Sequence, residues 1–349
     1  MRKCRVNRKA LNRRRRQLNE VVPESAFILV SQPECIRNRD VHHPYRQESS
    51  FYYYTGFDEP ESVMVYRPGL TPEYVMFVRP KDVERETWDG FRFGPDGVVA
   101  EFDADQAYSI DELDRFLPEL LLPVEQIYYQ LNLNSEFDHR LLELLKKVQV
   151  KKGRGATGIA DLIDPSEIIG EMRVRKHSEE VECLRQAGRI SAQGHIAAMK
   201  FVKPGVSERQ VLAVVNYMFL MGGAAREGYG SIVASGASAT TLHYTFNDQI
   251  CRDGELLLLD AGAEYEYYTG DITRTYPVNG KFTPTQKNFY EKVLNVQKAI
   301  IEMSRPGIPF PSLQEKTIDM LTQAMLDLNL LKGKKKDLIE SLAFKKYYP

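Results

Sequence analysis

Cysteine is scarce in this 349-residue chain, which contains four cysteines and a single tryptophan. The cysteines form no Cys-x-x-Cys pair and lack the regular spacing of a disulfide framework. We therefore expect a reducing compartment, the cytoplasm, and no cysteine-based metal site. Long apolar runs are also missing, so we expect neither a transmembrane helix nor a membrane partner.

A strong charge of either sign is also missing, because the formal net charge is -1. This balance gives no reason to expect nucleic acid as a partner. The N-terminus is an exception, since nine of the fifteen residues from Arg2 to Arg16 are Arg or Lys and the first acid is Glu20. A transit peptide is basic in this way but also rich in serine, and the first serine is Ser25. We interpret the segment as a basic first helix.

The length of the chain and its 43% hydrophobic content predict two folded domains. Strand and helix patterns mix in the first half, which predicts an α/β domain. We expect strands at residues 26–31, 62–66 and 74–78, and helices at 110–122 and 136–148. Asp164 precedes Pro165 and therefore resists the helical conformation. We place the first domain over residues 1–168 and the second over 169–349.

The second half opens with a long amphipathic pattern that predicts a helix over residues 177–200. Ser207 has the character of an N-cap for the next helix. Glycine-rich turns follow and separate short apolar segments. We expect strands at 228–237, 256–265 and 269–278, and helices at 286–303 and 312–330.

Two aspartates stand out because of their neighbours. Asp260 comes directly after Leu256 to Leu259, a run that predicts a strand buried on both faces. A carboxylate is costly to bury there unless a cation compensates its charge. If this strand and the one that begins at Asp271 form a hairpin about Tyr265-Glu266, the two aspartates lie directly opposite each other on one side of the sheet.

Opposed like charges repel each other, and one or two bound divalent cations would remove that penalty. The sequence leaves an alternative open, in which both aspartates are exposed turn residues or one of them pairs with Arg274. His243 is a further candidate, although a lone histidine is most often structural. The other histidines show no metal-ligand spacing, and no nucleophile-elbow, Walker or dinucleotide-binding motif occurs.

Segments in both halves carry a resemblance to a known family. In the second half they are Leu259-Asp260-Ala261-Gly262, Gly270-Asp271-Ile272-Thr273-Arg274-Thr275 and Leu242-His243-Tyr244. These segments resemble the aminopeptidase P branch of the creatinase-like, "pita-bread" metallopeptidases. In the first half, Pro44-Tyr45-Arg46-Gln47 and the run from Phe51 to Pro60 resemble the non-catalytic N-terminal domain of that branch. The likeness extends from residue 11 to the end of the chain.

The resemblance implies a mixed α/β fold, with a creatinase-like N-terminal domain followed by a pita-bread metallopeptidase domain. It also implies two divalent ions, usually Mn²⁺, of which Asp260 chelates one and Asp271 bridges both. His243 would contact the substrate and help to stabilise the tetrahedral intermediate. Trp88 matches a family position that reaches the active site of a neighbouring subunit, which implies a homo-oligomer. Core filling is the alternative for this large side chain.

The sequence departs from the family pattern near its C-terminus. The family uses two Asp, one His and two Glu as metal ligands, and its His segment is expected just after Lys346-Tyr347-Tyr348-Pro349. No histidine follows His243 in this chain. The resemblance therefore predicts an incomplete pita-bread domain, from a fragment or a truncated gene, and a chain that is inactive by itself.

The activity implied by the resemblance is removal of the N-terminal residue from peptides with proline in the second position. Proline-containing peptides are thus the expected partners. Two alternatives stay open: a prolidase that cleaves only Xaa-Pro dipeptides, and a non-catalytic pita-bread module that binds peptides or proteins. The presence of Asp260, Asp271 and His243 favours an enzyme.

Overall fold

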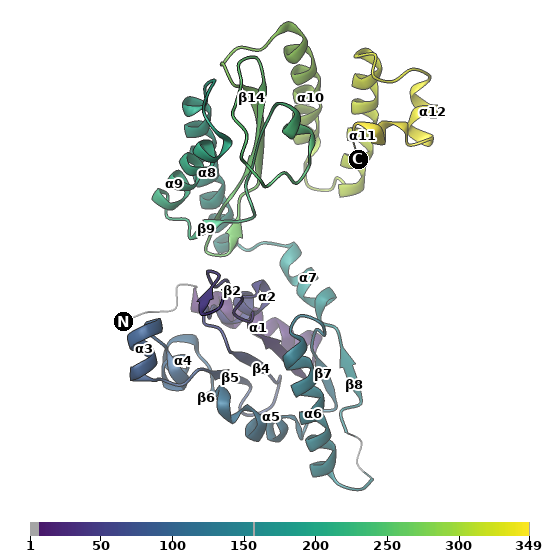
Figure 1. Ribbon diagram of the computed structural model, residues 1–349. Coiled ribbons are helices and arrows are strands. Elements are labelled where there is room, and N and C mark those ends of the chain that lie inside the picture. Colours follow the sequence, from purple (N-terminus) through teal and green to yellow (C-terminus); the bar gives the residue numbers. More distant parts are fainter. Residues whose placement is uncertain (1–6, 156–157, 349) are drawn as a thin grey trace. The chain divides into compact units, whose positions relative to one another are not determined.

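The computed structural model describes residues 7–155 and 158–348 (Figure 1). The chain divides into two compact units, Met1–Glu179 and Glu180–Pro349. Among the described helices, none combines the length and the apolar character that a bilayer-spanning segment needs.

A six-stranded sheet forms the centre of the first unit, in the spatial order β6-β5-β4-β1-β7-β8 (Figure 1). The strands are β1 (Ala26–Val30), β4 (Val63–Tyr66), β5 (Tyr74–Val78), β6 (Gln106–Ser109), β7 (Gln126–Tyr128) and β8 (Asp161–Ile163). β1, β4 and β5 pair in antiparallel fashion, whereas β6, β7 and β8 add to them in parallel. The three strands predicted in this half are confirmed, each to within one residue.

Helices cover both faces of this sheet. They are α1 (Arg8–Val21), α2 (Ser49–Thr55), α4 (Gly94–Phe102), α5 (Leu113–Leu121) and α6 (Ser135–Lys152). Phe27 and Leu29 of β1 pack with α1, α2 and α4, while Ala26 and Ile28 pack with α5 and α6. Side chains of a strand alternate between its two faces, so the mixed α/β domain expected from the sequence has three layers. Its remaining elements are β2 (Ile36–Asn38), β3 (Val41–His42), α3 (Val83–Asp89), the 3₁₀ helix η1 (Ile110–Glu112) and α7 (Ser166–Val174).

The basic N-terminal segment forms α1, and two of its arginines are buried. Arg14 and Arg15, each 3% exposed, donate to the backbone carbonyls of Tyr53 (2.8 Å) and Tyr54 (2.7 Å) in the last turn of α2. Carbonyls in a last helical turn have no partner within their own helix, and a cation there also complements the helix dipole. The prediction of a basic first helix is confirmed for α1. Arg2, Lys3 and Arg5 lie outside the described residues.

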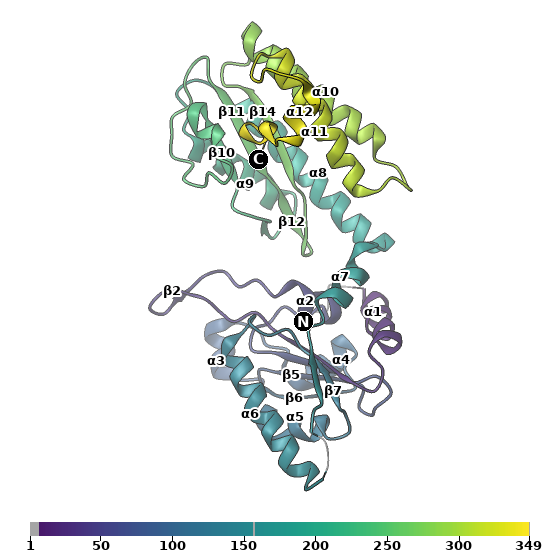
Figure 2. The ribbon, with the colours of Figure 1, turned by 90° about the vertical axis from the view of Figure 1, so that its right-hand side faces the viewer.

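The second unit is built on the antiparallel sheet β10-β11-β14, whose central hairpin continues into the small sheet β13-β12-β9 (Figure 2). The strands are β9 (Arg226–Glu227), β10 (Ile232–Ser235), β11 (Leu256–Ala261), β12 (Ala263–Tyr265), β13 (Tyr268–Thr269) and β14 (Ile272–Pro277). The helices α8 (Ser178–Phe201) and α9 (Glu208–Met221) pack against one face of β11. Ser207 caps α9 by accepting from the backbone N–H of Gln210, as predicted.

Only one face of β11 is buried under helices. Leu257 and Leu259 are fully buried against α8 and α9, whereas Leu256, Leu258 and Asp260 are half-buried on the opposite face. The prediction that this strand is buried on both faces is therefore wrong. A run of four leucines has no polar alternation that could have identified the more open face.

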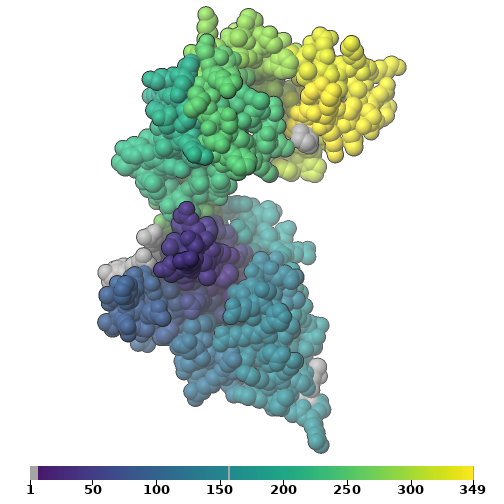
Figure 3. Space-filling model, in the orientation of Figure 1, coloured from purple at the N-terminus to yellow at the C-terminus, as the bar shows by residue number. Residues whose placement is uncertain are grey.

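Three helices follow the sheet along the chain. They are α10 (Pro284–Met303), α11 (Phe310–Asp327) and α12 (Lys335–Glu340); two short 3₁₀ helices, η2 (Gly236–Thr240) and η3 (Ala343–Lys346), complete the unit. α12 and η3 pack against α11, which Figure 3 shows as the yellow cluster. The two helices predicted here are confirmed, with bounds that differ by three residues or fewer.

Candidate metal centre

The hairpin that carries the two aspartates turns at Glu266 and Tyr267. Both residues have positive φ (48° and 67°) and link β12 to β13 as a two-residue loop, which is the backbone pattern of a type I′ turn. Asp260 consequently pairs with Thr273. The predicted pairing of Asp260 with Asp271, about a turn at Tyr265-Glu266, is wrong by one turn position. Moving the turn by one residue shifts the pairing by two, so the face on which each side chain lies is unchanged.

The carboxylates of Asp260 and Asp271 meet at one hydroxyl group. The Oη of Tyr229 donates to Oδ1 of Asp260 and lies 3.1 Å from Oδ1 of Asp271, to which it also hydrogen-bonds. Asp260 is half-buried in β11, and Asp271 is exposed just before β14. The two side chains therefore lie on the same side of the hairpin and within reach of one shared atom. Their role as metal ligands stays a prediction.

Tyr229 is a residue of this site that the sequence did not reveal. It lies between Gly228 and Gly230, in a glycine-rich stretch where no motif or spacing points to a polar function. Burial, and then the hydrogen bond to Asp260, raise the pKa of its hydroxyl above the ordinary range. The phenol therefore stays protonated and serves as the donor between two acceptors.

Gly262 allows the hairpin to change direction next to the carboxylates. A Cβ on this residue would lie 1.6 Å from the carbonyl oxygen of Gly270 on the facing strand. Only glycine tolerates so close an approach of two backbones. The interruption falls between β11 and β12 and between β13 and β14, which places Asp260 and Asp271 at the edges of the same break.

Arg274 does not neutralise this acidic pair in the described part of the chain. Its guanidinium donates to the backbone carbonyl of Thr273 (2.8 Å), and among the described residues it forms no ion pair with Asp260 or Asp271. The alternative in which Arg274 pairs with one of the aspartates is therefore wrong. Two carboxylates thus face each other with a neutral hydroxyl as their shared donor.

This donor set fits the chemistry of a hard divalent cation, since carboxylate oxygens are preferred by ions such as Mn²⁺. The number of ligating side chains is small, however. Among residues 7–155 and 158–348, no group of three or more His, Cys, Asp and Glu side chains is placed to hold a metal ion. The described residues supply two carboxylates, which is fewer than the shell of one such ion requires.

His195 hydrogen-bonds to the strand that carries Asp260. It lies on α8, is 3% exposed, and its Nε2 donates to the backbone carbonyl of Ala261 at 3.0 Å. Burial lowers the pKa of this imidazole, which favours its neutral form. The bond joins α8 to the residue next to Asp260, so this histidine has a structural role, in keeping with the absence of any ligand spacing around it.

His243 lies in the segment between η2 and β11, and its side chain is exposed. The next residue, Tyr244, is buried against Ile232, Ala234 and the half-buried Leu258. Leu258 and Asp260 are two residues apart on one strand and point to the same face. The segment of His243 therefore covers the face of the sheet that carries Asp260.

Trp88 belongs to the first unit, on α3, and its side chain is 83% exposed. α3 contains no buried residue. The alternative of core filling is therefore wrong for this tryptophan. Its expected contact with a neighbouring subunit stays a prediction.

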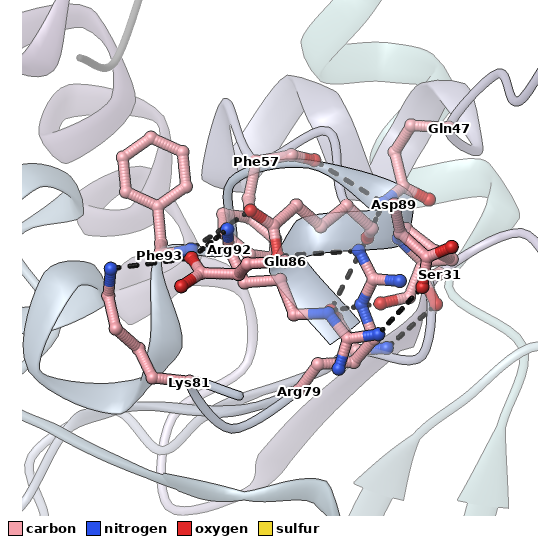
Figure 4. Close-up of polar contacts among 12 residues, drawn as sticks. Ser31, Gln47, Phe57, Arg79, Lys81, Glu86, Asp89, Arg92 and Phe93 are labelled. Atoms are coloured by element: carbon pink, nitrogen blue, oxygen red, sulfur yellow. Dashed lines mark hydrogen bonds and ion pairs between the residues drawn. The ribbon is translucent and has the colours of Figure 1, made fainter. Parts of the chain in front are cut away.

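Polar contacts rather than apolar packing hold α3 in place (Figure 4). The carboxylate of Glu86 accepts from the backbone N–H of Arg92 at 2.7 Å, and that N–H holds the pKa of Glu86 below its ordinary value. The guanidinium of Arg92 donates to Asp89 at 3.2 Å. Beyond the helix, the backbone N–H of Phe93 donates to the buried carboxylate of Glu59 at 3.0 Å. The first two bonds brace the C-terminal end of α3, and the third attaches the residues that follow it to the rest of the first unit.

Comparison with known proteins assigns both units. Residues 11–128 match the family described as "Aminopeptidase P, N-terminal domain", and residues 182–348 match "Metallopeptidase family M24". The Xaa-Pro aminopeptidase of Haemophilus influenzae is 36% identical over 337 residues, which cover 96% of this chain and 76% of that protein. The Xaa-Pro aminopeptidase of Escherichia coli is 35% identical over 346 residues, which cover 98% of this chain and 78% of that protein.

Solved structures agree with this assignment. The Pseudomonas aeruginosa aminopeptidase PepP superposes with a TM-score of 0.95 at 41% identity, over 98% of this chain and 78% of that one. Zinc-substituted E. coli aminopeptidase P in complex with product gives a TM-score of 0.93 at 35% identity, over 97% and 78% of the two chains. Fold and domain order define a two-domain metallopeptidase, a hydrolase. Within that class, the chain belongs to the Xaa-Pro aminopeptidase family. The expected fold, a creatinase-like N-terminal domain followed by a pita-bread domain, is confirmed.

Proposed function

We propose that this chain serves the release of the N-terminal residue from peptides with proline in the second position. The observation that carries the proposal is the convergence of Asp260 and Asp271 on the hydroxyl of Tyr229. A pair of carboxylates with one neutral donor is suited to divalent cations, and two such ions are the catalytic group of many aminopeptidases. The names of the H. influenzae and E. coli relatives support the substrate class.

In this proposal each residue has a distinct role. Asp260 and Asp271 would hold the divalent ions, and we propose Mn²⁺ because the ligands are hard oxygens. The ions, when bound, supply Lewis-acid polarisation of the scissile carbonyl and lower the pKa of water. His243 hydrogen-bonds to the substrate where negative charge develops and so stabilises the transition state. Its exposed side chain, next to a tyrosine that packs on the Asp260 face of the sheet, supports that role.

The 349 residues by themselves are proposed to bind divalent metal weakly and to lack peptidase activity. The reason is the donor set, since two carboxylates do not provide the fixed shell of several ligands that each ion needs. Relatives that share this fold are longer, and the chain spans 76–78% of the two quoted above.

The test is an assay with added Mn²⁺ that follows release of the first residue from an Xaa-Pro-Xaa tripeptide. We expect the 349-residue chain to show no turnover above a His243→Ala control. A version extended by the part of the E. coli relative that this chain does not match should cleave the tripeptide, and His243→Ala in that version should lose about 10²–10³-fold in kcat. Turnover by the 349-residue chain would contradict the proposed inactivity.

The same assay separates the alternatives. Cleavage of an Xaa-Pro dipeptide without cleavage of the tripeptide would identify a prolidase. Binding of peptide without any cleavage, in the extended version, would identify a binding module and would contradict the proposed function.

Trp88 is proposed to reach the active site of a second copy of the chain, which would make the protein a homo-oligomer. Support comes from the exposure of its side chain on a helix that is tied down by polar contacts. A cytoplasmic location is proposed because Cys35 and Cys251 are free thiols. Sedimentation of the extended protein tests the oligomer: we expect an assembly larger than one chain, and a monomer would contradict this proposal. Trp88→Ala is expected to keep its fold but to lose tripeptide turnover.

A further inference from the structure

A buried carboxylate of the second unit has no assigned role. Glu208 is the first residue of α9, and its side chain is fully buried, at 0% exposure. Its Oε1 accepts from the backbone N–H of Ser235 (2.7 Å) and from the hydroxyl of the same serine (2.8 Å). Its Oε2 accepts from the hydroxyl of Tyr244 (2.9 Å) and from the backbone N–H of Gln249 (3.0 Å).

Four donors occupy the acceptor capacity of this carboxylate. An ionised carboxylate has about four lone-pair sites, so the group is fully satisfied without water. Its position in the first turn of α9 adds the favourable field of the helix N-terminus. A buried carboxylate whose acceptor sites are all occupied makes strong hydrogen bonds. Removing one of the four donors leaves part of the buried charge without a partner, which costs free energy.

The donors come from both ends and the middle of a single segment. Ser235 ends β10, Gln249 lies fourteen positions further along the chain, and Tyr244 lies between them. The segment between Ser235 and Gln249 contains His243. One side chain on α9 therefore contacts this segment where it leaves β10, at the residue next to the histidine, and where it reaches the start of α9.

A second buried side chain ties the same segment to the sheet. The amide of Asn247, which is 5% exposed, accepts from the backbone N–H of Val233 (2.8 Å) and donates to the carbonyl of Ser231 (2.9 Å). Asn247 thereby continues the edge of β10. The hydroxyl of Tyr244, however, is bound by Glu208 and by Asp248, whose carboxylate lies 3.2 Å from that hydroxyl.

We propose that Glu208 is a positioning residue for His243 and acts through Tyr244. The inference rests on the proposed function, because it is the substrate contact of His243 that gives the position its importance. Glu208 itself touches no reacting atom. It holds the tyrosine ring against Leu258, and the ring fixes the backbone next to the histidine.

Two variants test whether the contact of Glu208 with Tyr244 positions His243 or only stabilises the segment that contains it. Tyr244→Phe removes the hydroxyl that contacts Glu208 and Asp248 and leaves the Ser235 and Gln249 bonds in place, so it is expected to fold even if Glu208→Gln does not. Tyr217→Phe is the matched control, because Tyr217 lies on α9 with a side chain that is 60% exposed.

The measurement is nuclear magnetic resonance of the 349-residue chain with ¹³C-labelled histidine, which gives one ring signal for each of six histidines. His243→Ala identifies the signal of His243. We expect Tyr244→Phe to shift or broaden that signal and to leave the other five unchanged, while Tyr217→Phe changes none. Amide hydrogen exchange between Ser235 and Gln249 should become about tenfold faster, as expected for the loss of one hydrogen bond to a charged group.

Each outcome decides the proposal. Faster exchange with an unchanged His243 signal would show that Glu208 supports the segment without positioning the histidine, and would overturn the proposal. No change in either measurement would overturn it as well. Failure of the proposed function looks different: the Tyr244→Phe signal moves, yet His243→Ala in the extended protein retains full turnover.

Discussion

The two sheets of this molecule are covered differently. The six-stranded sheet of the first unit has helices on both faces, and alternate residues of β1 are buried in two separate layers. The sheet of the second unit has α8 and α9 on one face of β11, whereas the other face holds half-buried leucines, Asp260 and the segment of His243. The first arrangement builds a scaffold, and the second leaves a face on which polar side chains can converge.

The contrast also appears in how charged groups are satisfied. Arg14 and Arg15 in the first unit are buried against backbone carbonyls and have a stabilising role. Asp260 and Asp271 in the second unit share one hydroxyl and have no cation as a partner among the described residues. Like charges that face each other lower stability, and proteins retain such arrangements mainly at functional sites.

The largest expected effect compares the two sheets directly. Phe27→Ala removes a fully buried ring from the first sheet and should lower the free energy of unfolding by about 3–5 kcal/mol. Leu258→Ala removes a half-buried side chain from the open face of β11 and should lower it by about 1 kcal/mol. Urea unfolding followed by circular dichroism measures both. Equal losses would contradict the difference in coverage.

A smaller effect of opposite sign is expected at the acidic pair. Asp271→Asn removes the repulsion between two facing carboxylates and should raise the free energy of unfolding of the metal-free chain by roughly 0.2–1 kcal/mol. Asp58→Asn, at an exposed position of the first unit, is the control and should leave it nearly unchanged. Urea unfolding at neutral pH checks this prediction, and a loss of stability in Asp271→Asn would show that the pair is not repulsive.

The smallest effect concerns the polar contacts of α3. The N–H of Arg92 holds the pKa of Glu86 below its ordinary value of 4.5. The carboxylate therefore contributes stability above pH 4.5, and this contribution is lost as the pH falls through the lowered pKa. Fluorescence anisotropy of Trp88, the only tryptophan, should fall in that acidic range as α3 loosens. In Glu86→Gln the anisotropy should be low at neutral pH already; an unchanged acid response in this variant would contradict the assignment.

Sequence patterns predicted the scaffold well because its elements alternate or repeat with clear periods. The three strands of the first half and the helices of the second were placed to within a few residues for this reason. The Ser207 cap was predictable because a hydroxyl before a helical pattern satisfies a free N–H.

The site was harder to predict because it depends on contacts between distant residues. The turn at Glu266-Tyr267 has positive φ at two residues that carry no Asn-Gly signal, so its position was missed by one. Tyr229 and Glu208 look like ordinary residues in the sequence, and only the fold brings them to Asp260 and Tyr244. The exposure of the Trp88 side chain could not be predicted either, because a single tryptophan can lie in the core or on the surface of a protein.

The central claim is that Asp260 and Asp271 form a cation site and are its only two carboxylate ligands among the described residues. Titration of the 349-residue chain with Mn²⁺ tests this claim most directly. Electron paramagnetic resonance of the free ion measures binding without any need for turnover. We predict weak binding, with a dissociation constant of about 10⁻⁴–10⁻³ M, that Asp260→Asn and Asp271→Asn each abolish. Binding that survives both substitutions would contradict the account, because the ion would then be held elsewhere.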